Sequence, residues 1–196
     1  MKQRLKRLIG AVLGLAVVAY PLGVYAGLSH GEPRGAALLL LAFFVPAAAL
    51  RVAKLKSERL TTLAALPLVT VSLLVASALL DAGGFILAVP TVINLLLLVA
   101  FGATLRYGPP MIERFARLQE PELSDEKLAW CRLWTRVWCA FFLVNGAVAA
   151  ALAAYAPLEL WTAYTGLVAY ALMGMLFALE WGLRRLRFGG VAEASR

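Results

Sequence analysis

The stretch RYGPPMIERFARLQEPELSDEKLAW, residues 106–130, is the longest charged segment of a chain that is otherwise strongly apolar. Of the 196 residues, 62 % are hydrophobic and only 15 % are charged, and the mean hydropathy is +0.82. A soluble domain usually carries about 25 % charged residues. The composition therefore predicts that lipid surrounds most of the chain, and the stretch 106–130 lies between two groups of apolar runs.

Six apolar runs are candidates to cross a bilayer, whose core of about 30 Å takes about 20 helical residues. Backbone that faces lipid must be hydrogen bonded within its own segment, so helices are predicted. We expect an all-α fold, a polytopic membrane helix bundle that forms one integral membrane domain over residues 1–196. The predicted spans cover about residues 8–28, 35–55, 60–80, 84–105, 130–156 and 158–184.

The first run also has features of a secretory signal peptide. It begins with the basic stretch MKQRLKRL, and VYA at residues 24–26 is similar to a cleavage site. Its apolar part of about 20 residues exceeds the roughly 7–15 residues of a signal-peptide core. We therefore expect it to be the first transmembrane helix.

The basic residues are distributed unevenly over the predicted loops. With the N-terminus in the cytoplasm, Arg34 is the only one of the 19 Lys and Arg residues on the outer side. Because cytoplasmic loops carry the excess of these residues, we predict a bacterial inner (cytoplasmic) membrane protein with both termini in the cytoplasm. Basic loops at an anionic leaflet explain the net charge of +8, so membrane lipids are the expected partners and nucleic acid is not.

The stretch 106–130 begins with a predicted short helix in the cytoplasmic headgroup layer, residues 110–119. Pro109 and Pro110 are expected to end the preceding span and to start this helix. Its apolar residues share one face, and its charged residues fall on another. The apolar face consists of Met111, Ile112, Phe115 and Leu118, and the charged residues are Glu113, Arg114 and Arg117.

A longer helix is predicted to follow, from the N-cap residue Ser124 to about residue 156. At about 48 Å it is too long to lie wholly in the membrane, so its first turns are expected in the cytoplasm. Trp130, Trp134 and Trp138 recur every four residues on it. We interpret them as half of the aromatic belt at the membrane surface.

Eight charged residues are predicted to gather in the cytoplasmic headgroup layer as a lipid- or anion-binding site. Guanidinium groups can hold phosphate or carboxylate through paired hydrogen bonds. The alternative is that these residues are interface anchors and local ion pairs, such as Glu180 with Arg184. The eight are Arg106, Glu113, Arg114, Arg117, Arg132, Arg136, Glu180 and Arg184.

Small residues recur every four positions in the last span, and polar residues are few within the spans. Small residues let helices approach closely, so we expect another helix of the chain, or a lipid tail, to pack there. Asn94 and Asn145 are expected to form hydrogen bonds between helices. The predicted helix-packing residues are Gly166, Gly174, Ala178, Gly182, Asn94 and Asn145.

The sequence offers little for catalysis. No lysine, histidine or carboxylate lies in the middle of a predicted span, and hydrolase and P-loop motifs are missing. Cys131 and Cys139 lie about 12 Å apart along one helix, too far for a disulfide, and with the single His30 they make a poor metal set. No catalytic residue, cofactor or metal is predicted, and a non-enzymatic role is favoured.

Several segments resemble bacterial membrane-protein families. GPPMIERFARLQEPEL, WCAFFLVNG and the Ala-Pro corner before the last helix are similar to intracellular septation protein A, although the N-terminal half departs from it. AYPLGVYAGLSHG, INLLLLVAFG, GPPMIERFARLQE and YALMGMLFALEW resemble an uncharacterised family encoded within aryl-polyene and fatty-acid-like gene clusters. The resemblance implies an inner-membrane envelope protein and names no catalytic residue.

Three functions remain as expectations. The first is a non-enzymatic, septation protein A-like envelope protein that acts as a scaffold or partner for envelope lipid or polyene biosynthesis at the cytoplasmic face. The second is a small carrier or flippase of a lipid-linked or polyene product. The third is a lipid-modifying enzyme that uses the charged layer. Besides lipids, the expected partners are other envelope-biosynthesis membrane proteins or a second copy of the chain in a homodimer.

Overall fold

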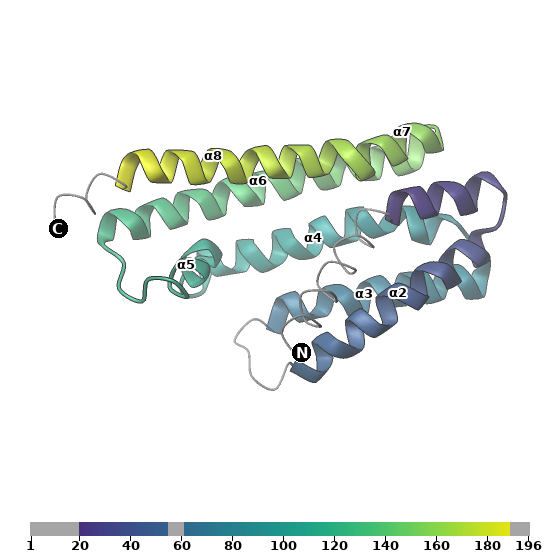
Figure 1. Ribbon diagram of the computed structural model, residues 1–196, viewed down its shortest axis with the longest axis horizontal. Helices are drawn as coiled ribbons and strands as arrows, with labels where there is room; N and C mark the ends of the chain where they lie inside the picture. The colour runs from purple at the N-terminus through teal and green to yellow at the C-terminus, as the bar shows by residue number, and fades with distance from the viewer. Residues whose placement is uncertain (1–19, 55–60, 189–196) are drawn as a thin grey trace, which may run out of the picture.

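The computed structural model describes residues 20–54 and 61–188, and all the regular structure in these ranges is helical (Figure 1). A helical segment at residues 20–29 comes first. It is followed by α2 (Pro33–Lys54), α3 (Thr61–Leu80), α4 (Gly84–Arg106), α5 (Met111–Ala116), α6 (Asp125–Tyr155), α7 (Leu158–Ala163), the π-helix η2 (Tyr164–Val168) and α8 (Ala169–Phe188). The prediction of an all-α protein is confirmed for these residues.

Three of the described helical runs are long and apolar enough to cross a membrane. They are Gly84–Arg106, Asp125–Tyr155 and Leu158–Phe188, and the last runs continuously through α7, η2 and α8. The two preceding helices contain shorter apolar segments, Pro33–Pro46 and Leu66–Leu80. The total of six spans stays a prediction.

Parts of the sequence interpretation fall outside the described residues. Residues 1–19 contain most of the first predicted span, its signal-peptide alternative and the basic start of the chain. Residues 55–60 and 189–196 contain further basic residues on which the predicted orientation depends.

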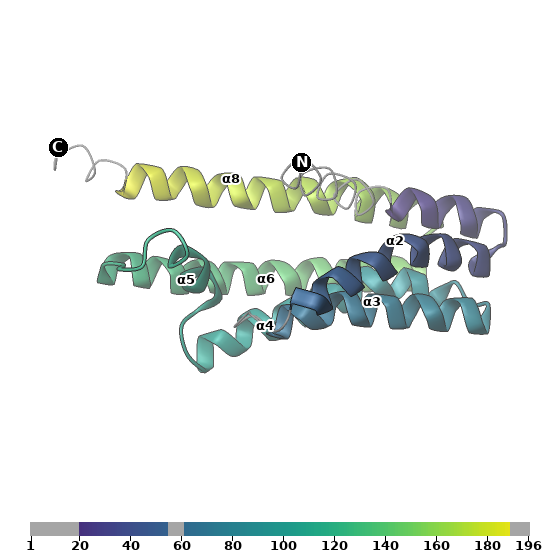
Figure 2. The same ribbon diagram turned by 60° about the horizontal axis from the view of Figure 1, so that its bottom comes forward.

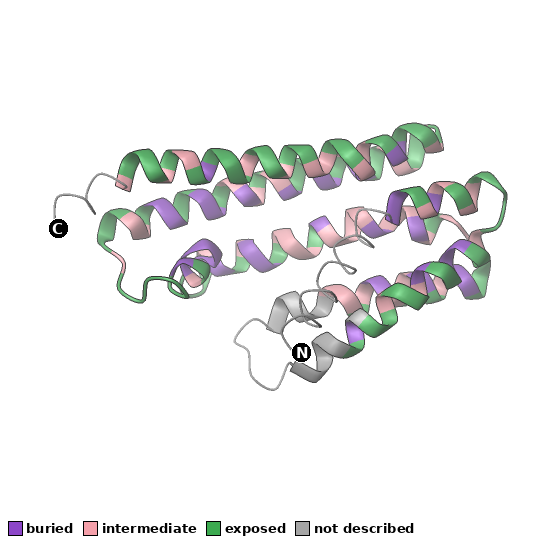
Figure 3. Cartoon of the chain, in the orientation of Figure 1, coloured by how far each residue is buried: buried purple, intermediate pink, exposed green. Residues whose placement is uncertain are grey.

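The helices pack unevenly. α4 lies against α6, α2 against α3, and α3 against α4, while the short α5 packs on α6 (Figure 1). α8 has few close backbone contacts with α4 or α6 and is drawn clearly apart from α6 in Figure 2. Most of α8 is accordingly exposed, whereas α6 turns a buried face toward the bundle (Figure 3).

The turns before α2 and after α3 meet at one end of the bundle, which we call the turn end. The backbone amide of Arg34 donates to the Asp81 carboxylate at 3.0 Å, and its Nε donates to the Ala78 carbonyl at 2.9 Å. Close by, the segment 20–29 approaches α2 so closely that a side chain at Gly27 would overlap Ala36. The helix pair α2 and α3 is thereby fixed to the start of the described chain.

A proline inside α4 determines how this helix contacts residues 20–29. Pro90 has no backbone N–H, so the carbonyl of Ile86, four residues earlier, loses its usual helical partner. The Tyr20 hydroxyl donates to that carbonyl at 2.6 Å, and both residues are buried. The side chain therefore replaces a hydrogen bond that water cannot supply in the interior of the bundle.

Two clusters of buried apolar side chains hold the bundle together. The cluster at the turn end includes Tyr20, Val24, Leu40, Leu74, Ile86 and Trp161. The cluster at the opposite end, which we call the α5 end, includes Phe101, Met111, Ile112, Trp130, Trp134, Trp138 and Phe142. The helices between the two clusters surround a cavity.

The link between α4 and α5 differs in detail from the prediction. α4 ends at Arg106, and Gly108 adopts a φ of +92°, a left-handed conformation that side chains disfavour. Pro110 is extended and precedes α5 as its N-cap residue, so it does not occupy the first helical turn. Gly108 therefore turns the chain after α4, and the proline pair follows it directly before α5.

Candidate functional site

Glu113 and Arg117 form an ion pair of 2.8 Å at the α5 end. The Glu113 side chain is 10 % exposed and that of Arg117 is 42 % exposed, so the carboxylate is buried beside its own cation. Arg117 also donates to the Pro121 carbonyl at 2.9 Å, which ties the following link to the pair. Glu113 is buried beside Ile112 and Ala116, and its i,i+4 spacing from Arg117 lets the two charges pair.

Glu180 is the second buried carboxylate of the α5 end, and its partner is an indole. Trp138 Nε1 donates to Glu180 Oε2 at 3.3 Å. The expected ion pair with Arg184 is not formed between these two described residues. Arg184 is partly exposed one turn further along α8. Glu180 therefore links α8 to α6, and the expected pairing within α8 was wrong.

The eight charged residues of the predicted site divide into two groups of four. The first group lies close enough to the buried Cys131 thiol to influence it electrostatically, and it consists of Glu113, Arg117, Glu180 and Arg184. The second group lies outside this cluster and consists of Arg106, Arg114, Arg132 and Arg136. Arg114 donates to the Pro109 carbonyl at 2.9 Å, whereas the other three are exposed without a polar partner among the described residues. A lipid- or anion-binding role of these eight residues stays a prediction.

The three tryptophans at the start of α6 face the interior of the bundle. Trp130, Trp134 and Trp138 are 8 %, 4 % and 3 % exposed. Trp138 packs on Phe177 of α8 with ring centroids 4.5 Å apart, and Trp130 packs on Phe188 at 5.8 Å. The interpretation as a lipid-facing aromatic belt was therefore wrong. These side chains instead join α6 to α8.

Most of the small residues of the last span do not pack against another described helix. A side chain at Gly174 or Gly182 would meet no described atom within 4 Å, and Ala178 is exposed. Only Gly166 is closely approached, because a side chain there would lie 3.1 Å from Cβ of Pro21. Packing of the strip within the described chain is therefore limited to its first member, and α8 meets α6 through other residues such as Phe177.

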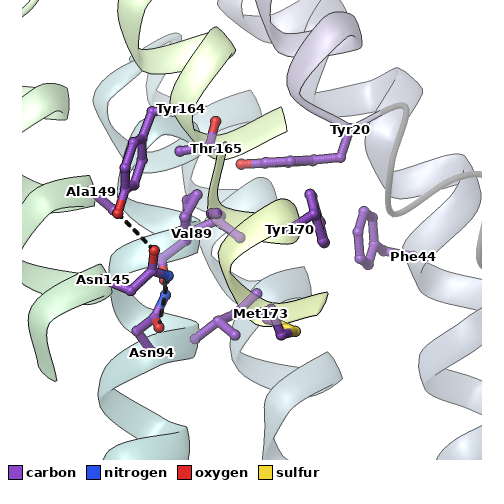
Figure 4. Close-up of a pocket in the computed structure, with 13 residues that line it drawn as sticks. Tyr20, Phe44, Val89, Asn94, Asn145, Ala149, Tyr164, Thr165, Tyr170 and Met173 are labelled. Carbon is purple, nitrogen blue, oxygen red and sulfur yellow. Dashed lines mark hydrogen bonds between the residues drawn. The ribbon is translucent and has the colours of Figure 1, made fainter. Parts of the chain in front are cut away.

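A cavity of about 340 Å³ lies among the helices of the bundle, and Figure 4 shows the side chains that line it. Its wall combines residues 20–29, α2, α4, α6, η2 and α8. Most of the lining is aromatic or aliphatic, with a small polar patch on one side (Figure 4). The described lining residues are Tyr20, Phe44, Val89, Pro90, Ile93, Asn94, Asn145, Ala149, Tyr164, Thr165, Ala169, Tyr170 and Met173.

The polar patch is a chain of hydrogen bonds with a fixed direction. The Tyr164 hydroxyl donates to Asn145 Oδ1 at 2.9 Å, and Asn145 Nδ2 donates to Asn94 Oδ1 at 3.1 Å (Figure 4). Asn94 Nδ2 donates to the Pro90 carbonyl at 2.8 Å. Because a carbonyl can only accept, it fixes the orientation of Asn94, and Asn94 then fixes that of Asn145. The chain joins η2, α6 and α4.

Gly146 makes the contact between the two asparagines possible. A side chain at this position would lie 2.9 Å from Cβ of Asn94, too close for an undisturbed fit. The glycine therefore lets α6 approach α4 closely enough for Asn145 to reach Asn94. The polar wall of the cavity depends on this approach.

The cavity is suited to an uncharged, largely apolar molecule. Its described lining contains no lysine, arginine, histidine, aspartate or glutamate. A charged group placed there would lose its hydration without gaining an opposite charge, which is very unfavourable. The site can therefore hold apolar surface and orient one neutral polar group.

Sequence reasoning identified the two asparagines but missed Tyr164 and Tyr20. The Ala156–Pro157 corner offered a signal for Tyr164. The helices on the two sides of this corner run antiparallel, so residues at similar distances from it along the sequence, such as Tyr164 and Asn145, lie near each other. Asn145 lies about one turn further from the corner than Tyr164, and a tyrosine side chain can cover that difference. A signal for Tyr20 was Pro90, since its missing N–H leaves a carbonyl that needs a donor.

No protein-family model matches the chain, and no curated protein or solved structure is significantly similar to it. For the described residues, fold and site define a class of protein: an all-α fold with helices of membrane-spanning length and a neutral, mainly apolar cavity among them. The resemblances to septation protein A and to the gene-cluster family remain expectations from the sequence.

Proposed function

We propose that the protein is a multi-pass membrane protein that binds an uncharged, lipid-like molecule in the cavity between its helices without changing it chemically. The observation that carries this proposal is the cavity itself, about 340 Å³ of mainly apolar space with one oriented polar chain. Sites for small molecules combine apolar surface with a few well-placed polar groups in this way. Binding is favoured over catalysis because the described lining is neutral, whereas acid, base and nucleophilic catalysis usually needs ionisable groups with perturbed pKa values.

The proposal includes a six-span arrangement in the bacterial inner membrane, with both termini in the cytoplasm. The uneven distribution of basic residues supports this orientation. In this arrangement Arg34 and Asp81 lie at the outer surface, and α5 lies in the cytoplasmic headgroup layer. The cavity then falls within the membrane, where a lipid-like molecule can reach it without crossing water.

The exposed arginines of the α5 end are proposed to hold the protein at the anionic cytoplasmic leaflet. Each basic residue near such a surface contributes about 1 kcal/mol of attraction. Arg106, Arg132 and Arg136 are free of other described partners and therefore suited to this role. The same surface is the proposed docking face for envelope-biosynthesis proteins, in keeping with a septation protein A-like scaffold.

A lipid-modifying enzyme receives less support. Its candidate groups were the two carboxylates of the charged layer, yet Glu113 is paired with Arg117 and Glu180 accepts a hydrogen bond from Trp138. A carboxylate engaged in this way is less available as a base or nucleophile.

Photolabelling tests the proposed binding. The purified protein in lipid nanodiscs would be irradiated with a long-chain methyl ester that carries a diazirine on its chain. We expect cross-links in peptides that contain Asn94, Tyr164 and Met173, which line the cavity. Ala169→Phe, which fills the lining, should reduce them, whereas Ala171→Phe on the exposed side of α8 should not. Cross-links restricted to outward surfaces and unaffected by Ala169→Phe would contradict the proposal.

A carrier or flippase is the second candidate, and the loose attachment of α8 favours it. α8 contributes Ala169, Tyr170 and Met173 to the cavity wall but has few close backbone contacts with α4 or α6. The π-helix η2 directly precedes it, and such turns often mark functional sites and bends. This wall can therefore move more easily than the others.

Tethering α8 would test the carrier. Cysteines replacing Trp138 and Phe177, whose rings are in contact, would be joined by a short thiol cross-linker in a background lacking Cys131 and Cys139. A carrier should then stop moving a fluorescent lipid across vesicle membranes while photolabelling of the cavity persists. Unchanged transfer after complete cross-linking would rule out a mobile α8.

A further inference from the structure

We infer that the molecule held in the cavity is recognised through an uncharged carbonyl oxygen that accepts hydrogen bonds from the side-chain amides of Asn94 and Asn145. The inference rests on the proposed function, because it specifies the ligand chemistry of the same cavity. Its support is the direction of the hydrogen-bond chain in the wall and the neutrality of the lining.

The two asparagines together retain two unused donors. An asparagine amide carries two N–H groups, and in each residue one of them donates to a described partner. Asn94 Nδ2 donates to the Pro90 carbonyl, and Asn145 Nδ2 donates to Asn94 Oδ1. The fixed direction of the chain keeps both nitrogens in their places. Both residues line the cavity side by side (Figure 4), so the wall offers two neighbouring N–H groups.

Other polar groups of the wall are engaged elsewhere. The Tyr20 hydroxyl donates to the Ile86 carbonyl at 2.6 Å, and the Thr165 hydroxyl donates to the Trp161 carbonyl at 2.8 Å. The Tyr164 hydroxyl donates to Asn145. The amide oxygens of Asn94 and Asn145 each accept one bond within the chain. The asparagine pair thus retains two N–H donors, and its oxygens each retain one lone pair; the two neighbouring donors are the feature that an acceptor on the ligand would use.

A carbonyl oxygen matches two neighbouring donors best. It has two lone pairs and no proton of its own, so it can accept both N–H groups at once. A hydroxyl group would also have to find an acceptor for its proton. An ether oxygen is a poorer match, because it lacks the strongly polarised C=O bond.

The acceptor must also be uncharged. A carboxylate or phosphate in the cavity would have no lysine, arginine or histidine beside it among the described lining residues. Burial of such an anion costs far more than burial of a neutral carbonyl. The remaining ligand chemistry is that of an ester, amide, ketone or quinone carbonyl attached to an apolar body. That body would contact the aromatic and aliphatic part of the lining, which includes Phe44, Ile93 and Met173.

Competition against the photolabel tests this chemistry. The competitors are four compounds of equal chain length, namely a methyl ester, a methyl ether, an alkane and a carboxylate, together with a short-chain quinone. The ester should compete at a concentration roughly five- to tenfold lower than the ether, the ratio expected for one neutral hydrogen bond. The carboxylate should compete less well than the ester. Comparison of ester with quinone then shows which source of the carbonyl fits the cavity better.

The outcomes separate this inference from the proposed function. Equal competition by ester, ether and alkane would overturn the carbonyl while leaving a binding cavity. Stronger competition by the carboxylate than by the ester would overturn the requirement for neutrality. The absence of any labelling in the cavity would overturn the proposed function and this inference with it.

Two variants test whether the asparagines cause the preference for the ester over the ether. Asn145→Leu and Asn94→Leu keep approximate side-chain size, and each removes one of the two donors, so each should lower the ester-to-ether ratio. Tyr155→Phe lies on α6 outside the lining and should keep the ratio, so it is the control. A full preference retained in both leucine variants would overturn the assignment.

A spectroscopic measurement on the unaltered protein does not depend on how the variants fold. The ester is labelled with carbon-13 at its carbonyl and bound to the wild-type protein in nanodiscs. Two hydrogen bonds to the oxygen should lower the carbonyl stretching frequency relative to the same ester in nanodiscs without protein. A frequency equal to that of the ester in lipid alone would overturn the inference.

Discussion

Gly146 and Gly174 lie in long apolar helices, yet their surroundings are opposite. At Gly146 a side chain would lie 2.9 Å from Cβ of Asn94, whereas at Gly174 it would meet no described atom within 4 Å. We therefore expect Gly146→Ala to lower the stability by about 1–3 kcal/mol through overpacking. Gly174→Ala should be neutral or stabilising by up to about 1 kcal/mol, because alanine favours a helix.

Thermal unfolding in detergent would measure both variants. A lower Tm for Gly146→Ala than for Gly174→Ala supports the close approach of α6 to α4. Equal Tm values for the two variants would mean that α6 does not approach α4 closely enough for Asn145 to reach Asn94.

Tyr20 and Pro90 provide a second prediction at this scale. Tyr20→Phe leaves the buried Ile86 carbonyl without its donor, which should cost about 1–3 kcal/mol. In a Pro90→Ala background the restored backbone N–H can take over that carbonyl, so the same substitution should cost clearly less. A double-mutant cycle measures this coupling, and Tyr25→Phe is the control. If the effects of Tyr20→Phe and Pro90→Ala on stability were additive, the Tyr20 hydroxyl would not be replacing the backbone N–H that Pro90 lacks.

Individual residues were predictable where few alternatives existed. Asn94 and Asn145 stand out in an apolar sequence, and buried amides need partners. The burial of Glu113 was not predictable from helical period alone, because α5 is short and its orientation depends on contacts with α6. A residue's neighbours on other helices decide its exposure in such cases.

At the scale of elements, the way α5 docks on α6 leads to a third prediction. Ile112 is 8 % exposed, and its backbone N–H donates to Thr135 Oγ1 at 3.2 Å, whereas Phe115 is 36 % exposed. Ile112→Asp should therefore release α5 and speed limited proteolysis of the link between α5 and α6. Phe115→Asp should have a smaller effect. Faster cleavage of the Phe115 variant would mean that α5 docks through the face around Phe115 and Leu118.

The ion pair on α5 leads to a fourth prediction. Arg117→Gln leaves the Glu113 carboxylate buried without its cation, while Arg114→Gln removes a bond to a backbone carbonyl at the surface. We expect the first change to destabilise the protein by about 1–2 kcal/mol and the second by less than about 0.5 kcal/mol. Thermal unfolding of the two variants at equal detergent concentration checks the order. Equal losses would contradict the buried position of Glu113.

The existence of the helices followed from the sequence more readily than their orientation. Long apolar runs between charged or proline-rich segments predicted helices at α4 and α6, because lipid-facing backbone requires internal hydrogen bonds. Whether Trp130, Trp134 and Trp138 face the interior of the bundle or the lipid was not predictable in the same way. In a membrane protein both the interior and the lipid are apolar, so periodicity alone does not distinguish a buried aromatic face from a lipid-facing one.

At the scale of the whole molecule, the predicted orientation can be tested with single cysteines. The native Cys131 and Cys139 are first replaced by alanine. A cysteine at Ser29, at the turn end, should react with an impermeant thiol reagent in intact cells, and one at Ser124, at the α5 end, should react only after the membrane is opened. Labelling of Ser124 in intact cells would contradict the proposed orientation.

The cavity could not have been predicted from the sequence. It arises because α8 stands apart from α6 while the two ends of the bundle are packed by Trp161 at one side and Trp138 at the other. Helix separation of this kind depends on side-chain volumes in several helices at once. The strip of small residues in η2 and α8 predicted a close approach, but within the strip only Gly166 makes one.

The proposed binding function depends most on the occupancy of this cavity. A cryo-EM or crystal structure of the protein in native lipid nanodiscs, with no ligand added, tests it most directly. We predict elongated, lipid-like density among Tyr20, Phe44 and Tyr164, with its polar end within hydrogen-bond distance of Asn94 and Asn145. A cavity that is empty or filled by ordered water, with lipid density restricted to the outer faces of the helices, would contradict the account.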